Sequence, residues 1–420
     1  MATYYSRTTG NWNNRFTWST ISHGGSAATA YPTSSDIVNI GSTHSVTVPV
    51  DSACATLNFE NTSSLSINAS YQLTVTNNIT IYSLTTTNNI ITIDGDGIIS
   101  CTNLNIGTNI NPSATRTTTL NSSINTFNVT GNLNLYSNTR ASFFNNAIFN
   151  LNSGTLTLNG SVVTTNENAS NNSQFYMNQS TQNATLILNN ATPFILGGVG
   201  ISTINFNGTG NTVNYNYAGN VTCYPTTYNN LTISGSGEKT TTDIIVNGVF
   251  TLKDTAIQAG TIPTYGANSA IKYNGSTTQT TGGELPLIFN GAGGIIIDNV
   301  NGVNLNANLT VNGIFNSIDY LSIGTHLLTL NGEINCGVLV GGATSDLTIG
   351  TGTTEVNIPS VSVCNFIVNR DIKLCGNVTV LCVYTNNGFN VDLNGYSLIT
   401  PYTRVSTYIY SLNNKLIYIN

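Results

Sequence analysis

Residues 308–315 read Asn-Leu-Thr-Val-Asn-Gly-Ile-Phe, and variants of this phrase recur along the chain. Residues 243–250 read Asp-Ile-Ile-Val-Asn-Gly-Val-Phe, and residues 128–135 read Asn-Val-Thr-Gly-Asn-Leu-Asn-Leu. The apolar and polar residues alternate with the period of a half-buried strand, and Asn or Gly stands where a tight corner is needed. The chain is therefore predicted to repeat a strand–corner–strand unit.

The Asn-Gly corner is compatible with two architectures. An Asn-Gly step is the usual signal for a two-residue hairpin, which over 420 residues would give several antiparallel sandwiches. The units here follow one another without Pro clusters or charged linkers, which favours stacked coils. We therefore predict an all-β fold, a right-handed parallel β-helix (β-solenoid), with roughly 20 to 25 residues per coil.

The composition agrees with a stack of uncharged coils. Charged residues are 7% of the chain, against about 25% in ordinary soluble proteins, and Asn is roughly one residue in six. Stacked corners would place like charges on one another, whereas stacked Asn side chains gain hydrogen bonds along the axis. Apolar residues are 40% of the chain, enough for a buried core, so a disordered polar chain is excluded.

The two ends of the chain differ from its middle. Residues 1–50 contain both tryptophans, Trp12 and Trp18, and are predicted to form an N-terminal cap or docking region in which these two residues make the docking contacts. Residues 51–400 are predicted to be the solenoid repeats, and residues 401–420 a C-terminal cap strand.

Several partners and compartments are not expected. The net charge is −6 and the 11 basic residues form no stripe, so no nucleic acid is expected. No apolar run approaches the roughly 20 residues that span a bilayer, so no membrane insertion is expected, and no motif calls for a cofactor. The N-terminus does not read as a secretory signal peptide, and the seven cysteines are expected to be reduced thiols in the core.

Three passages resemble a known group of proteins. Residues 10–48 contain Gly-Asn-Trp, Thr-Trp and two short strand-like runs; residues 228–240 contain a strand-like run followed by a Gly-Ser corner, and residues 294–313 contain strand-like runs with Asn-Gly corners. These passages are similar to β-helical surface and adhesin repeat proteins of Bacteroidota. Those proteins normally carry an export signal and a C-terminal sorting domain, and neither is recognised in this sequence. The chain therefore looks more like a bacteriophage fibre or decoration protein of that kind.

The resemblance implies partners and a location. A phage fibre of this type is expected to be a homotrimer, to contact other virion structural proteins, and to bind host cell-surface glycan. It would be made in the host cytoplasm and lie on the virion surface. The alternative location is extracellular or on a cell surface, as for a cellular adhesin or filament subunit.

One acidic pair is a candidate for chemistry. Asp94 and Asp96 alternate with Gly in residues 93–97, and on a strand they would share a face about 6.6 Å apart. They are interpreted as a solvated turn, with a weak metal site and a catalytic pair as alternatives. No other catalytic motif occurs, so no catalytic residue is assigned.

One aromatic pair is a candidate for sugar binding. In the strand-like run 213–218, Tyr215 and Tyr217 would share one face. That face is either inward core, a subunit contact, or a platform for glycan. The predicted function is a non-enzymatic structural virion fibre or decoration protein that adheres to host glycans. The alternatives are a polysaccharide-degrading tailspike and a cellular adhesin or filament subunit.

Overall fold

The computed structural model describes residues 1–41, 43–60, 62–82, 88–107, 115–140, 143–177, 183–335, 337–400, 409–412 and 415–418. For residues 138–144 and 409–418, only the backbone of the described positions is used below. These residues form β-strands and one 3₁₀ turn, η1 (Arg15–Thr17), and none is in an α-helix. The chain divides into two compact units, which we call the N-terminal unit (residues 1–217 and 226–229) and the C-terminal unit (residues 218–225 and 230–420).

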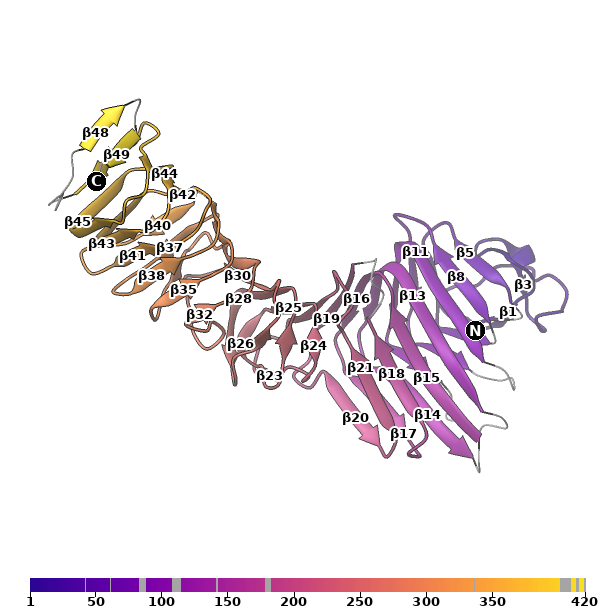
Figure 1. The fold of residues 1–420 in the computed structure, drawn as a ribbon. Helices are drawn as coiled ribbons and strands as arrows, with labels where there is room; N and C mark the ends of the chain where they lie inside the picture. Colours follow the sequence, from indigo (N-terminus) through magenta and orange to yellow (C-terminus); the bar gives the residue numbers. More distant parts are fainter. Residues whose placement is uncertain are drawn as a thin grey trace. The chain divides into compact units, whose positions relative to one another are not determined.

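The N-terminal unit is built from parallel strands stacked in register (Figure 1). One row runs through β1 (Thr3–Ser6), β4 (Ile37–Ile40), β7 (Thr56–Glu60), β10 (Asn78–Tyr82), β12 (Asn103–Ile106), β14 (Leu133–Arg140), β17 (Val162–Asn166) and β20 (Phe194–Gly198). A second row runs through β2 (Gly10–Asn11), β5 (Ser45–Val48), β8 (Ser63–Ile67), β11 (Asn89–Cys101), β13 (Arg116–Val129), β15 (Phe143–Leu151), β18 (Asn172–Tyr176) and β21 (Ile201–Asn205). A third row joins β6 (Ser52–Cys54), β9 (Gln72–Val75), β16 (Gly154–Leu158), β19 (Ala184–Leu188) and β22 (Thr212–Tyr215) through the long strands β11 and β13.

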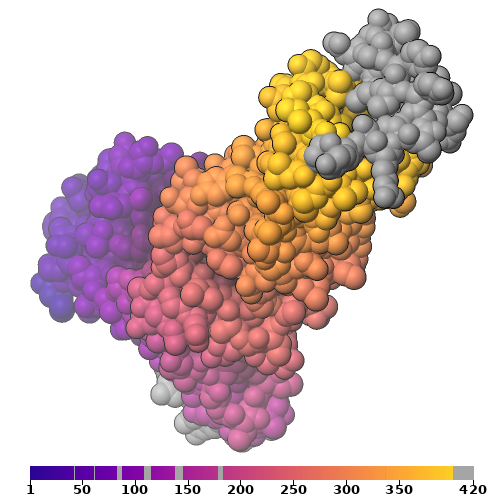
Figure 2. Space-filling model, turned by 90° about the vertical axis from the view of Figure 1, so that its left-hand side faces the viewer, coloured from indigo at the N-terminus to yellow at the C-terminus, as the bar shows by residue number. Residues whose placement is uncertain are grey.

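The C-terminal unit repeats this arrangement with shorter strands, and its coils follow one another in chain order along the surface seen in Figure 2. One row runs through β25 (Asn230–Ile233), β28 (Val249–Ala259), β30 (Ala270–Gly275), β33 (Gly294–Ile297), β36 (Phe315–Ser317) and β39 (Ile334–Asn335). Another runs through β32 (Ile288–Phe289), β35 (Leu309–Val311), β38 (Leu327–Leu330), β41 (Asp346–Ile349), β43 (Val361–Val368), β45 (Val378–Asn386) and β47 (Leu398–Ile399). Shorter rows join β31 (Gln279–Thr280), β34 (Val303–Asn304), β37 (Tyr320–Ser322) and β40 (Val338–Val340), and β42 (Val356–Ile358), β44 (Ile372–Leu374) and β46 (Val391–Asp392). The prediction of an all-β parallel solenoid is therefore confirmed.

Coil length is not constant, as hydrogen bonds between equivalent asparagines of adjacent coils show. In the N-terminal unit the Asn58 amide donates to Asn39, 19 positions earlier, but the Asn189 amide donates to Asn159, 30 positions earlier. In the C-terminal unit the Asn331 amide donates to Asn312, 19 positions earlier. The predicted length of roughly 20 to 25 residues per coil fits some coils, such as those joined by Asn103 and Asn78, 25 positions apart, and by Asn312 and Asn290, 22 positions apart, but not the 19-residue and 30-residue coils.

The core is a stack of inward-facing aliphatic side chains. Burial alternates along each strand, so that every second residue points inward. In the first row the residues in register are all fully buried: Val38, Leu57, Ile79, Leu104, Leu133 and Val162. Each coil therefore buries its apolar face on the coil before and after it, which no single coil could do alone.

Asparagine ladders run along the stack, as predicted. In the N-terminal unit the Asn189 amide donates to Asn159 at 2.8 Å, and the Asn216 amide donates to Asn189 at 3.0 Å. In the C-terminal unit, Asn312 donates to Asn290 at 2.6 Å and Asn331 donates to Asn312 at 2.7 Å. Each side chain in the middle of a ladder both donates and accepts, so one coil satisfies the amide of the next.

Antiparallel strands lie at both ends of the described chain. β3 (Trp18–Ser19) pairs antiparallel with β1, and it packs residues of the predicted cap against the first coil. The strands β4 and β5, also within residues 1–50, already belong to the parallel stack. At the other end, β49 (Lys415–Tyr418) pairs antiparallel with β46 and with β48 (Ile409–Leu412), whereas residues 401–408 lie outside the described part. A strand that runs against the stack blocks its open edge.

The expectation that all cysteines are reduced is wrong for the C-terminal unit. Cys364 and Cys382 form a disulfide, and Cys375 is also disulfide-bonded. The cause is the register, because β43 and β45 pair with a one-residue shift after Val363 and this brings Cys364 beside Cys382. The buried Cys54, Cys101 and Cys223 are free thiols, and Cys336 lies outside the described residues.

Candidate functional site

The predicted acidic pair lies on β11. Asp94 is in register with Ser66 and Ser123, and the pairing shifts after Gly95, whose φ of 103° only glycine adopts easily. Asp94 is partly exposed and Asp96 is exposed. Within the described residues, no group of three or more His, Cys, Asp or Glu is placed to hold a metal ion. Both residues thus lie inside a strand and not in the solvated turn of the first interpretation, and the metal and catalytic alternatives stay untested.

The predicted tyrosine pair is split between the core and the surface. Tyr215 is fully buried at the end of β22, and its hydroxyl lies 2.8 Å from that of Tyr228. This agrees with the inward reading of the tyrosine face and removes Tyr215 as a platform for a surface sugar. Tyr217 follows the end of the strand and is partly exposed, so its role in glycan binding stays a prediction.

The two tryptophans form the centre of the N-terminal cap. Both are fully buried, with ring centroids 5.2 Å apart in an edge-on contact, and the Trp18 indole donates to the Trp12 carbonyl oxygen at 2.7 Å. Their rings hold the cap together and are closed to a docking partner. A docking role for residues 1–50 would therefore use other residues of this region.

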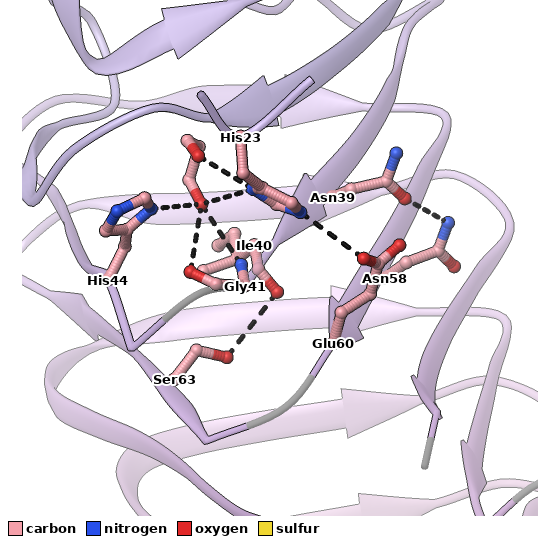
Figure 3. A network of polar contacts seen from close by, with 9 residues as sticks. His23, Asn39, Ile40, Gly41, His44, Asn58, Glu60 and Ser63 are labelled. Atoms are coloured by element: carbon pink, nitrogen blue, oxygen red, sulfur yellow. Dashed lines mark hydrogen bonds and ion pairs between the residues drawn. The ribbon is translucent and has the colours of Figure 1, made fainter. Parts of the chain in front are cut away.

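A polar network beside this cap contains serine, histidine and glutamate (Figure 3). Ser6 ends β1, and its hydroxyl lies 3.0 Å from Nδ1 of His44 and 3.3 Å from Nδ1 of His23. On the other side, Nε2 of His23 lies 3.3 Å from Oε2 of Glu60, which ends β7. Serine, histidine and glutamate in contact are the components of a nucleophilic triad, so their proton positions decide what the network can do.

The burial of Ser6 excludes a serine nucleophile, although Nδ1 of His44 also lies beside its hydroxyl. His23 Nδ1 lies 2.7 Å from the Ser6 carbonyl oxygen, which can only accept, so Nδ1 carries a proton and cannot act as a base toward the hydroxyl. The hydrogen bond to Glu60 raises the pKa of His23, whereas burial lowers the pKa of His44. Ser6 itself is fully buried and out of reach of a substrate. The network therefore ties the loop after β3 to three stacked coils.

A polar groove lies in the C-terminal unit, along β28 and the segment 277–284. Its volume is about 440 Å³. Its walls carry two acidic residues, Asp254 and Glu284, together with glutamine and threonine side chains and the apolar Ile257. None of the described residues that line the groove is Lys or Arg. The groove thus offers hydrogen-bond acceptors and hydroxyls and no positive charge.

Glu284 is held rigidly in this groove. The residue is only 3% exposed, and its Oε1 accepts hydrogen bonds from the Tyr273 hydroxyl at 2.6 Å and from the Gly282 amide at 2.8 Å. The Tyr265 hydroxyl fixes the backbone by donating to the Glu284 carbonyl oxygen at 2.6 Å. Burial and the negative charge of Glu284 raise the pKa of Tyr273 well above its usual range, so it stays a donor. No described residue donates to Oε2 of Glu284.

Asp254 lies in β28, on the wall of the groove formed by that strand, and its backbone is strained. Its φ is 56°, a left-handed conformation that is uncommon for residues other than glycine, and it lies in the middle of β28. Its Oδ2 accepts a hydrogen bond from the Gly235 amide at 3.0 Å. Sequence reasoning missed both acidic residues. The available signals were an Asp inside a strand pattern and a Glu after two glycines, in a chain with few charges.

The comparisons with known proteins give no relative: no family model, curated protein or solved structure matches this chain. Among the described residues, no helix is long and apolar enough to cross a bilayer.

Proposed function

We propose that this chain is a non-enzymatic structural fibre or decoration protein of a virion, assembled as a homotrimer with other virion proteins, that adheres to glycan on the host surface. The proposal places the protein on the virion surface after synthesis in the host cytoplasm. Its support is the resemblance of residues 10–48, 228–240 and 294–313 to β-helical surface proteins, together with the physical character of the stack.

The observation that carries the proposal is the repeated interlocking of coils. Each coil pairs its backbone with the next, stacks its aliphatic residues on the next, and passes a ladder hydrogen bond to the next. All three interactions run in one direction, so the stack resists unfolding along its axis. A part that must hold a fixed form outside a cell benefits from this construction, and it needs no catalytic centre.

The test is electron microscopy of native particles with antibody against this chain. The proposal expects labelled, threefold-symmetric appendages on capsid or tail, and a mass of three chains for the purified protein. Labelled filaments or patches on a cell envelope, without a virion, would instead support the cellular adhesin and overturn the virion assignment.

A second candidate is a polysaccharide-degrading tailspike, and the groove with Asp254 and Glu284 favours it. Glycoside hydrolysis uses two carboxyl groups that flank the scissile bond, about 5 to 9.5 Å apart. The assay is release of reducing ends from host capsule or envelope polysaccharide by the purified chain. Release that disappears in Glu284→Gln would replace the non-enzymatic proposal with this one.

A further inference from the structure

In the groove of the C-terminal unit, the carboxylate of a nearly buried residue, Glu284, has one oxygen to which no described residue donates. Burying a carboxylate is costly unless hydrogen bonds compensate it. Tyr273 and Gly282 compensate Oε1 of Glu284, but Oε2 receives no hydrogen bond from the described residues, although the residue is almost fully buried. Because Glu284 lines the groove, a ligand that enters it can supply the missing donor.

The remaining groups of the groove also favour a ligand that donates hydrogen bonds. Asp254 keeps its Oδ1 free of described donors, and its left-handed backbone is the type of local strain that is retained at binding sites. The hydroxyls of Thr277 and Thr280, which also line the groove, make no hydrogen bond within the described residues. Ile257, 62% exposed, adds an apolar surface beside them.

We propose that this groove binds an uncharged oligosaccharide, whose hydroxyls donate to Glu284 and Asp254 and whose apolar ring face packs on Ile257. A sugar ring presents hydroxyl donors at its edge and C–H groups on its face, which matches carboxylates beside an exposed isoleucine. Two carboxylates without a basic residue among the lining groups disfavour uronic or sialic acids, because like charges in a partly desolvated groove repel. The inference rests on the proposed adhesive function and places its receptor site.

The test is calorimetric titration of the full chain with neutral hexasaccharides of glucose, mannose, galactose and N-acetylglucosamine, and with hexagalacturonate as the acidic probe. We expect at least one neutral probe to bind and hexagalacturonate to bind at least 10-fold more weakly. Failure of every neutral probe, or equal affinity for the acidic one, overturns the proposal.

Variants of the two acidic residues test whether the oligosaccharide binds in the groove. Glu284→Gln keeps the shape of the side chain, and Asp254→Asn keeps a residue that tolerates the left-handed backbone. Each is expected to weaken binding at least 10-fold, whereas Glu333→Gln, at an exposed position outside the groove, is expected to leave it unchanged. Matching circular dichroism and melting curves establish that the variants fold. Unchanged affinity in both folded groove variants overturns the assignment.

The outcome is separable from that of the proposed function. Binding without release of reducing ends supports both proposals. Binding with release supports the groove as the saccharide site and overturns the non-enzymatic function. Virion appendages in the microscope together with failure of all probes leave the structural role intact and overturn the groove alone.

Discussion

The N-terminal and C-terminal units use one stacking rule, but only the later coils of the N-terminal unit reach 29 or 30 residues. In the N-terminal unit the Asn150 amide donates to Asn121, 29 positions earlier, and in the C-terminal unit the Asn331 amide donates to Asn312, 19 positions earlier. The ladder bond has the same form in both units. Coil length is therefore free to vary at the corners, because stacking requires only that equivalent strands meet in register.

The two units stabilise their coils by different additional means. The wide coils of the N-terminal unit enclose an aromatic stack, with Phe175 between Phe149 and Phe206 at centroid distances of 5.1 and 5.7 Å. The narrower coils of the C-terminal unit add the Cys364–Cys382 disulfide and the buried Arg370. A smaller coil buries less apolar surface, so covalent and polar links gain in relative importance. The predictions below test this difference.

The largest effect is expected from Phe175→Ala in the N-terminal unit. Removing a fully buried ring leaves a cavity between two aromatic neighbours and should cost about 4 kcal/mol of unfolding free energy. Peptide-resolved hydrogen exchange should report faster opening in the N-terminal unit and no change in coils 290–390. Equal loosening of both units would show that they unfold as one. Phe16→Ala, at a residue that is 52% exposed, is the control.

The disulfide is expected to act on the C-terminal unit alone. Cys364 and Cys382 are 18 residues apart, and closing a loop of that size stabilises a fold by about 3 kcal/mol in the chain-entropy model. The double variant Cys364→Ala/Cys382→Ala should lower the denaturant midpoint of the C-terminal coils and leave exchange in the N-terminal unit unchanged. An unchanged midpoint would mean that the narrow coils do not depend on this link.

Arg370 is expected to hold three coils together. The residue is 2% exposed, and its guanidinium donates to the carbonyl oxygens of Gly350 at 2.7 Å, Gly332 at 3.3 Å and Asn331. Arg370→Met fills a similar volume but leaves these acceptors without a donor, at a cost of about 2 kcal/mol. The measurement is hydrogen exchange of residues 330–370 at increasing denaturant concentration, which reports the unfolding free energy of these coils. A neutral result would show that water replaces the guanidinium.

The ladders are expected to contribute equally in both units. Asn189→Ala and Asn312→Ala each remove the middle rung of a ladder and two side-chain hydrogen bonds, so each should cost about 1 kcal/mol. Thermal melts of the two variants should shift by similar amounts. A clear difference between the two shifts in melting temperature would show that the stabilisation by a ladder depends on coil length, and that the two units do not follow one stacking rule.

The smallest effect concerns pH and the network beside the cap. The pKa of His23 is raised in the folded state, mainly by Glu60, so its contribution is complete below the unfolded pKa of about 6.5 and is lost as pH rises through the folded value. The pKa of His44 is lowered by burial, so its contribution has the opposite sign: it is present above the unfolded pKa and is lost as pH falls through the folded value.

His44→Asn therefore isolates the contribution of His23. In that background, exchange of residues 1–25 should quicken as pH rises above 6.5, after correction for the intrinsic rate, by less than about 1 kcal/mol because the ion pair is partly exposed. Adding Glu60→Gln should abolish this pH dependence. Its persistence would show that Glu60 is not the group that holds the proton on His23.

The amino-acid sequence alone determined the local structure. Period-2 alternation in phrases such as 308–315 predicts strands, the absence of linkers predicts stacking, and the abundance of Asn predicts ladders, because each depends on neighbours in the chain or on repetition. Tertiary structure decided what depends on accumulated register. Coil length places Cys364 beside Cys382, turns Tyr215 inward, and brings Asp254 and Glu284 to one groove from different coils. One residue more or fewer at any corner would shift the register and separate such residues. The repeated sequence pattern does not give the length of each corner, so it does not predict which residues of different coils come into contact.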